Sequence, residues 1–314
     1  MYFKIINVSF EPTDIVVDSG MGLANVYSLL LDKGVPSISF SFQAQFPFGN
    51  KTPDFLRAIF SKQLALIMER YPTISRVGIA CNSLSFAIIS NVDSLEQTHN
   101  VKIFSIRGMG AKRALYTTIN DYIGIIGSEM AIFSDQHRLS IERENISVNN
   151  SFGEERFKDI QYKRLIGTEL IDAIERGDID DIKTEAKALF LKLFKPYKND
   201  KSNSYPDVLV WGCTHFEAFD KVLREALTEV LIDEKININP FEIVFIMPGT
   251  ELAYEMINAN NSSLDLVGFL NNPFIQNLIY PMHFTNEHKN ANGDIPLAYR
   301  YLDKTISLQY WGEE

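Results

Sequence analysis

The stretch Val208-Leu209-Val210-Trp211-Gly212-Cys213-Thr214-His215 joins a strand pattern directly to a helix pattern. Its first four residues are an apolar run typical of a buried strand, and apolar residues at helical spacing follow over 218–230. Cys213 therefore lies at the carboxyl end of a predicted strand, where a helix begins. The other cysteine of the chain, Cys81, has the same setting, because it directly follows the apolar run 77–80.

Strand-like runs alternate with helical patterns along most of the chain, which is typical of parallel sheets with helices on both faces. The sequence therefore predicts an α/β fold. We expect strands at residues 15–17, 38–42, 77–80, 102–106, 122–126, 208–211 and 243–246, and another within 1–10. We expect helices at residues 23–33, 55–70, 111–119, 183–194, 218–232 and 251–258. Two polar stretches are expected to be a bridging segment (142–161) and a surface loop (195–205).

Length and composition narrow the class of protein. A chain of 314 residues favours two domains, and 46% hydrophobic with 22% charged residues is typical of a soluble globular protein. The net charge of −10 argues against nucleic acid or an anionic membrane as the main partner. No apolar segment approaches the roughly 20 residues of a membrane span, and the first residues lack a secretory signal. Two cysteines do not indicate a disulfide framework, so we expect a reducing cytoplasm.

The two cysteines are the main candidates for chemistry. Either one alone is best explained as a small buried hydrophobe. Together, at matching turns, they favour a functional role, because a helix N-terminus stabilises a thiolate and lowers the thiol pKa. One thiolate could remove a proton from a carbon while the other thiol delivers a proton to the opposite face. Their distance in the sequence argues against a redox pair, and no cysteine–histidine cluster predicts a zinc site, so we expect no metal and no cofactor.

Several predicted strands end in a turn of small or polar residues. In open α/β sheets ligands bind beyond the carboxyl ends of the strands, so we expect these turns to converge on one site. The turns are Asp18-Ser19-Gly20, Cys81-Asn82-Ser83, Gly127-Ser128 and Gly212-Cys213-Thr214.

Four short blocks of the sequence, in order, resemble the signature blocks of glutamate racemase, a member of the Asp/Glu racemase superfamily. The blocks are Asp18-Ser19-Gly20, Pro47-Phe48-Gly49, Ala80-Cys81-Asn82-Ser83 and Gly212-Cys213-Thr214-His215. Further similarity lies at residues 106–111, 124–128, 170–177 and 283–302, so the resemblance spans nearly the whole chain. The last block is its most specific part, because aspartate racemase relatives usually have a glutamate where His215 stands.

The resemblance implies roles for individual residues. Cys81 and Cys213 would be the two acid/base catalysts, with Asp18 acting near the first, and His215 and Glu175 near the second. Two of these have ordinary alternatives: Asp18 could cap the following helix, and Glu175 lies in an acidic segment where a solvated face is the default.

Substrate binding is implied for a second group of residues. Hydroxyl and amide groups would bind the carboxylates and ammonium of an amino acid, and a glycine would allow close backbone approach. The residues of this group are Asp18, Ser19, Phe48, Gly49, Asn82, Ser83, Thr214 and His215.

Some positions depart from the family pattern. Phe48 stands where tyrosine is usual, Ser83 where threonine is usual, and Ala131 where a threonine is expected. Phe42 occupies a position where aspartate is common, and residues 247–249 replace an acidic-Ser/Thr-Gly turn. These changes leave open a racemase of aspartate or another acid, and a non-catalytic amino-acid binder is a third possibility.

The resemblance also implies an architecture of two flavodoxin-like domains with the active site in the cleft between them. We expect residues 1–103 with 240–314 to form the first domain, and residues 104–239 the second. The implied partner is a small acidic amino acid, the implied location is the cytoplasm, and a homodimer is possible. The implied activity supplies D-glutamate for peptidoglycan and so for cell wall and cell shape.

Overall fold

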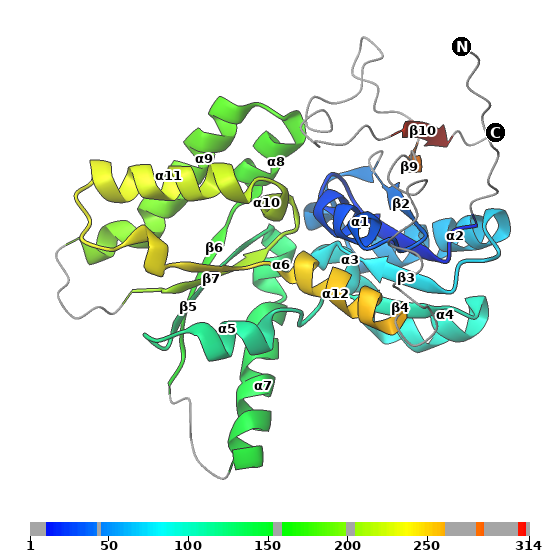
Figure 1. Ribbon diagram of the computed structural model, residues 1–314, viewed down its shortest axis with the longest axis horizontal. Helices are drawn as coiled ribbons and strands as arrows, with labels where there is room; N and C mark the ends of the chain where they lie inside the picture. Colours follow the sequence, from blue (N-terminus) through cyan, green and yellow to red (C-terminus); the bar gives the residue numbers. More distant parts are fainter. Residues whose placement is uncertain are drawn as a thin grey trace.

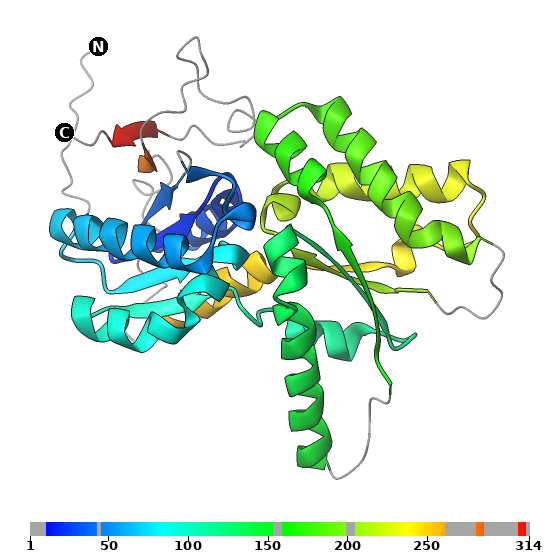
Figure 2. The same cartoon turned by 180° about the vertical axis from the view of Figure 1, so that it is seen from behind.

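The computed structural model describes residues 11–42, 45–152, 159–198 and 205–260, and the backbone of two further strands at 281–285 and 307–311. The described chain forms two parallel sheets, each covered by helices on both faces (Figures 1 and 2). This confirms the α/β class predicted from the sequence. No described helix combines the length and the apolar character that crossing a membrane requires. The strand expected within residues 1–10 lies outside the described residues.

The first sheet has the strand order β10-β9-β2-β1-β3-β4, with all neighbours parallel. Its strands are β1 (Asp14–Asp18), β2 (Ser37–Ser41), β3 (Arg76–Ile79), β4 (Lys102–Ser105), β9 (Pro281–Thr285) and β10 (Ser307–Trp311). The helices that belong to it are α1 (Leu23–Asp32), α2 (Pro53–Arg70), α3 (Asn82–Ile88), α4 (Val92–His99) and α12 (Pro248–Asn260), with 3-10 turns η2 (Phe48–Asn50) and η3 (Ile89–Asn91).

The second sheet has the order β6-β5-β7-β8, again all parallel. Its strands are β5 (Tyr122–Gly127), β6 (Gln161–Ile166), β7 (Val208–Gly212) and β8 (Val244–Ile246). The accompanying helices are α5 (Ala111–Thr117), α6 (Glu129–Phe133), α7 (Gln136–Phe152), α8 (Thr168–Arg176), α9 (Ile179–Phe194), α10 (His215–Ala218) and α11 (Asp220–Asp233), with 3-10 turns η4 (Lys195–Tyr197) and η5 (Pro240–Glu242).

The two sheets share one topology. In each, the first two strands along the chain lie side by side, the third pairs with the other edge of the first, and the fourth follows the third. This is the flavodoxin-like order, in which the ligand crevice lies where the strand order reverses. Cys81 follows the third strand of the first unit, and Cys213 follows the third strand of the second. The matching turns seen in the sequence are therefore equivalent positions of two similar units.

We call the two units the first and second lobe, after their sheets. One of the three hydrophobic clusters formed by the described residues spans both lobes: Val16 and Met256 of the first lobe belong to the same buried cluster as Trp211 and Phe216 of the second. Helix α12 lies against the first lobe although the chain reaches it directly from β8 of the second (Figure 1). The domain boundaries at 103/104 and 239/240 stay a prediction.

Some elements differ from those expected. The polar stretch 142–161 is not a bridging segment, because most of it continues the long helix α7 and its end begins β6. Helix α7 buries only a narrow stripe, with Ile141 and Val148 inside, so the sequence shows little apolar periodicity. The helix expected at 218–232 corresponds to α11, which begins at Asp220, and a separate short helix, α10, precedes it. Of the expected loop 195–205, residues 195–197 form η4, and 199–204 lie outside the described residues.

Candidate active site

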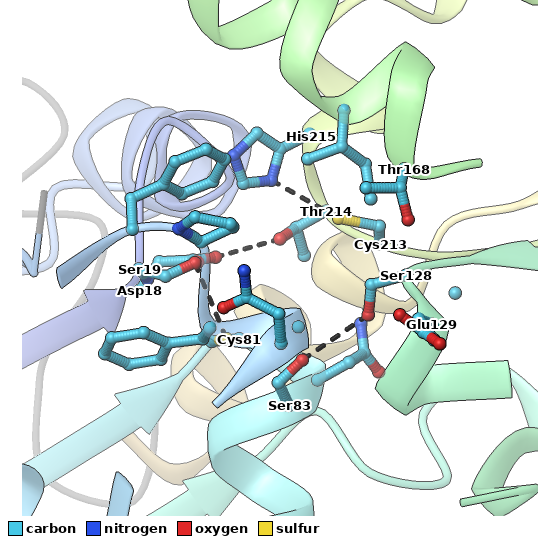
Figure 3. A pocket seen from close by; sticks show the side chains of 18 of the residues that line it. Asp18, Ser19, Cys81, Ser83, Ser128, Glu129, Thr168, Cys213, Thr214 and His215 are labelled. Atoms are coloured by element: carbon cyan, nitrogen blue, oxygen red, sulfur yellow. Dashed lines mark hydrogen bonds between the residues drawn. The ribbon is translucent and has the colours of Figure 1, made fainter. Parts of the chain in front are cut away.

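A cavity lies between the lobes, at the carboxyl ends of strands from both sheets (Figure 3). Its walls include Asp18 at the end of β1, Ser19 after it, Cys81 after β3, Ser128 after β5, and Cys213 after β7. All four turns that the sequence singled out therefore meet at one place. Both cysteines are free thiols and line the same cavity from opposite lobes.

Cys213 is backed by a histidine and a carboxylate. Its sulfur lies 3.3 Å from Nδ1 of His215, and Nε2 of the same ring lies 2.6 Å from Oε1 of Glu175. Burial lowers the pKa of His215, but the negative charges of Cys213 and Glu175 outweigh it and raise that pKa well above its ordinary value. The ring lies between the sulfur of Cys213 and the carboxylate of Glu175, which favours its protonated form.

Cys81 is backed by a hydroxyl and a carboxylate. Its thiol donates to Oγ of Ser19 at 3.8 Å, and that hydroxyl donates to Oδ1 of Asp18 at 3.2 Å. Burial, and then the negative charge of Asp18, raise the pKa of Cys81 well above its ordinary value. The helix N-terminus at Cys81 was expected to lower this pKa, and that expectation is wrong. The first turn of α3 contributes one backbone hydrogen bond from Leu84, which does not offset the loss of solvent and the nearby carboxylate.

The two thiols thus have parallel surroundings with different intermediaries. In both cases one group separates the sulfur from a buried carboxylate, but a hydroxyl cannot carry a positive charge as an imidazole can. Burial and the carboxylate of Asp18 favour a neutral thiol at Cys81, whereas Cys213 lies against a histidine whose pKa is raised. Two thiols with different partners therefore face the same cavity.

Hydrogen bonds across the lobes hold this arrangement together. The Thr214 hydroxyl donates to Oδ2 of Asp18 at 2.9 Å, and the backbone N–H of Met21 donates to Oε1 of Glu175 at 2.6 Å. Each bond joins the end of β1, or the turn after it, to a residue of the second lobe. The carboxylates that serve the two thiols are thus also points of contact between the lobes.

Two glycines allow this close contact. A Cβ on Gly20 would lie 2.0 Å from Oε1 of Glu175, and one on Gly22 would lie 2.2 Å from the Thr214 hydroxyl. Neither site has room for a side chain, because real Cβ atoms do not approach other atoms this closely. The turn 18–22 is therefore glycine-rich because the second lobe packs directly on its backbone.

The ordinary alternatives for the acidic residues do not hold. Helix α1 begins after Gly22 without a side-chain cap, and the carboxylate of Asp18 instead accepts from Ser19 and Thr214. Glu175 is buried, with 9% of its surface exposed, although neighbouring acids of its segment are solvated. No local pattern marks this residue, because its burial depends on contact with the other lobe.

The residues implied to bind substrate lie around the cavity. Its walls include Phe48, Gly49, Asn82, Ser83 and Thr214. The amide nitrogen of Asn82 is buried and, within the described residues, has no hydrogen-bond partner, so it is available to a ligand. The Ser83 hydroxyl lies 3.4 Å from that of Ser128, across the lobes.

The departures from the family pattern differ in their distance from the cavity. Phe48 lines it, whereas Phe42 is a core residue whose ring packs on those of Phe40, Phe48 and Phe60. Ala131 is buried in α6 behind the wall. Of these three positions, only Phe48 changes the lining directly.

Five polar wall residues were not among the predicted site residues. They are Asn50, Ser128, Glu129, Thr168 and Asp172. Ser128 could have been found, because Gly127-Ser128 is one of the strand-end turns. Thr168 and Asp172 belong to α8, which carries them to the cavity beside Glu175. Only the position of that helix at the seam between the lobes brings them there.

Comparison with known proteins agrees with this geometry. Glutamate racemases of Neisseria meningitidis serogroup C and Oceanobacillus iheyensis are 29% and 24% identical, over 70% and 68% of this chain and 75% and 71% of theirs. No family model matches the chain. The chain is similar to glutamate racemases. The resemblance inferred from its short motifs is thus confirmed, and these relatives are amino-acid racemases, a class of isomerase.

Solved structures show the same fold. A glutamate racemase isoform of Bacillus anthracis superposes with a TM-score of 0.67 at 18% identity, covering 96% of this chain and 98% of its own. Glutamate racemase of Francisella tularensis in complex with D-glutamate gives 0.64 at 18% identity, with 97% and 98% covered. The Escherichia coli enzyme with L-glutamate and an activator gives 0.63 at 19% identity, with 96% and 98% covered.

Proposed function

We propose that the chain is a cofactor-independent glutamate racemase that interconverts L- and D-glutamate by two-cysteine acid/base catalysis. The observation that carries the proposal is the meeting of the only two cysteines, from equivalent strand ends of two lobes, at one cavity. The similarity to named glutamate racemases supports the choice of substrate.

The proposed reaction is a proton exchange at the α-carbon. The thiolate of Cys213 takes the α-proton, and the electrons of the broken C–H bond remain on a carbanion next to the carboxylate. The thiol of Cys81 then donates its proton to the opposite face, which inverts the centre and leaves Cys81 as the thiolate. The reverse reaction starts from that second state, so protons and charges balance in both directions.

The surrounding groups suit these two roles. His215 as imidazolium stabilises the Cys213 thiolate, and Glu175 fixes the orientation and charge of the ring. Ser19 and Asp18 provide a hydrogen-bonded path from the Cys81 thiol to a buried carboxylate. Such pre-oriented charges lower the barrier most in a site closed to water.

Substrate binding is proposed at the polar walls. Asn82, Ser83 and Ser128 offer hydrogen-bond donors for carboxylates, while Asp18, held by the Thr214 hydroxyl, offers a negative charge near the ammonium. Phe48 provides no hydroxyl to the site. The choice between glutamate, aspartate and another acid as substrate is therefore the property to test. Product D-glutamate would supply peptidoglycan synthesis in the cytoplasm; a homodimer stays a prediction.

Two experiments test the proposal. Loss of optical rotation is measured for glutamate and for aspartate, and inversion of aspartate alone would replace the glutamate assignment with that of another racemase of the superfamily. Exchange of the α-hydrogen in heavy water is followed by NMR, and no exchange with any acidic amino acid would favour a non-catalytic binder.

A further inference from the structure

Glu217 is a buried carboxylate with no place in the mechanism above. It lies on α10, two residues after His215, and only 5% of its surface is exposed. It does not line the cavity. A buried charge is costly unless it is well paired, so its surroundings need an explanation.

Four donors surround this carboxylate, and all belong to the first lobe. Oε1 accepts from the backbone N–H of Gly249 at 2.6 Å. Oε2 accepts from the Asn25 amide at 2.9 Å, from the Thr250 backbone N–H at 3.0 Å and from the Thr250 hydroxyl at 3.3 Å. Asn25 lies on α1, and the other two residues lie in the first turn of α12.

The backbone is shaped to admit this carboxylate. A Cβ on Gly249 would lie 2.9 Å from Oε2 and 3.0 Å from Oε1 of Glu217. The first turn of a helix has backbone N–H groups without partners inside the helix. Here Glu217 accepts hydrogen bonds from two of these groups. One side chain of the second lobe therefore fills a prepared site at the start of α12.

Helix α10 cannot hold its own position. It has only four residues, and a single turn gains too few internal hydrogen bonds to be stable alone. Yet it carries His215, whose ring must meet Cys213 and Glu175 at the same time. Displacement of catalytic groups by about 1 Å can cost 100-fold in rate, so an external anchor for this turn matters.

We propose that Glu217 is a positioning residue of the active site: by binding α1 and the first turn of α12, it fixes α10 and holds His215 beside Cys213. It acts through His215 and does not touch the substrate. The inference rests on the proposed racemase reaction for its effect on rate, but its effect on the Cys213 thiolate can be measured without turnover.

The test uses Glu217→Gln, which keeps the shape but puts an amide NH2 against the donors Asn25 and Thr250. Turnover is measured in the otherwise native chain. The rate at which iodoacetamide alkylates Cys213 at pH 7 is measured in a Cys81→Ser background, where Cys213 is the only thiol. We expect kcat to fall about 10-fold or more with KM within about threefold, and alkylation to slow about fivefold.

A paired substitution makes the test specific. Adding Asn25→Asp to Glu217→Gln restores a donor–acceptor pair between α10 and α1, and should recover a large part of both losses. Glu251→Gln is the matched control, because this carboxylate lies in the same turn of α12 but pairs with exposed Arg113; it should change neither rate by more than about twofold. If Glu217→Gln does not fold, Asn25→Ala removes one of the four donors and should give smaller losses in the same two rates.

Two results would overturn the proposal. One is a folded Glu217→Gln whose kcat and alkylation rate stay within about twofold of the native values. The other is a loss that the paired substitution does not recover. Should the native chain racemise no acidic amino acid, the proposed function fails while the alkylation measurements still decide the role of Glu217.

Discussion

Glu175→Gln is the sharpest test of the charge arrangement behind Cys213. The change keeps the size and shape of the side chain and removes only its negative charge. In the structure Oε1 of Glu175 is buried and lies 2.6 Å from Nε2 of His215. The same oxygen accepts a hydrogen bond from the backbone N–H of Met21. The neutral amide can still accept from one of these groups, so the lobes should remain together.

The size of the expected effect follows from the charge-assisted hydrogen bond between Glu175 and His215. Such a bond is worth about 1.5–3 kcal/mol, against roughly 1 kcal/mol for a neutral one. Replacing the charge therefore removes about 0.5–2 kcal/mol of stabilisation of the imidazolium, and the pKa of His215 should fall. At a pH between the native and the lowered value, the imidazolium beside Cys213 is lost. We then expect kcat/KM for glutamate to fall by about 2- to 30-fold.

The assay is an NMR titration of histidine ring signals, with that of His215 assigned from His215→Gln. Because the pKa of His215 is raised on folding, its contribution to stability is present below about pH 6.5 and lost as the pH rises through the folded value. The unfolding free energy should therefore fall less steeply with pH in Glu175→Gln. Glu169→Gln, an exposed carboxylate on the same helix, is the control. If His215 titrates at the same pH in native protein and Glu175→Gln, the assigned role of Glu175 is wrong.

Three further predictions concern the thiols, the turn and the seam. Cys81→Ser and Cys213→Ser should each abolish racemisation with the fold intact by circular dichroism; near-native turnover in either variant would end the two-base mechanism. Gly22→Ala should lower the melting temperature and reduce kcat/KM at least 100-fold, because its Cβ would lie 2.2 Å from the Thr214 hydroxyl; an unchanged melting curve would contradict the packing described. Burial raises the pKa of Glu217 to about 7 from 4.5. The native protein should therefore lose on the order of 3 kcal/mol of unfolding free energy between pH 4.5 and 7, and Glu217→Gln should lose less, as measured by denaturant titrations. If the unfolding free energy depends on pH equally in both proteins, the raised pKa is refuted.

Local patterns in the sequence predicted the fold class and the position of both cysteines. A buried parallel strand has a continuous apolar run, and the turn after it marks the end of the sheet where ligands bind, so such features can be found without a structure. The neutral state of Cys81 could not be found this way, because it depends on burial and on the carboxylate of Asp18.

The contacts between the lobes could not be predicted from the sequence either. The hydrogen bonds from Met21 to Glu175 and from Gly249 to Glu217 join segments far apart in the chain. Helix α7 was missed for a different reason: it projects from its lobe and buries few residues, so its sequence has the polar character of a loop (Figure 2).

The unequal partners of the two thiols have a thermodynamic consequence for the proposed reaction. Mirror-image substrates have identical free energies in water, so the equilibrium favours neither, and kcat/KM must be the same in both directions at every pH. The imidazolium behind Cys213 and the hydroxyl behind Cys81 therefore cannot make the enzyme a better catalyst for one enantiomer at low concentration. Any difference between the two directions must appear as equal changes in kcat and KM. It can therefore be measured only when the enzyme is saturated.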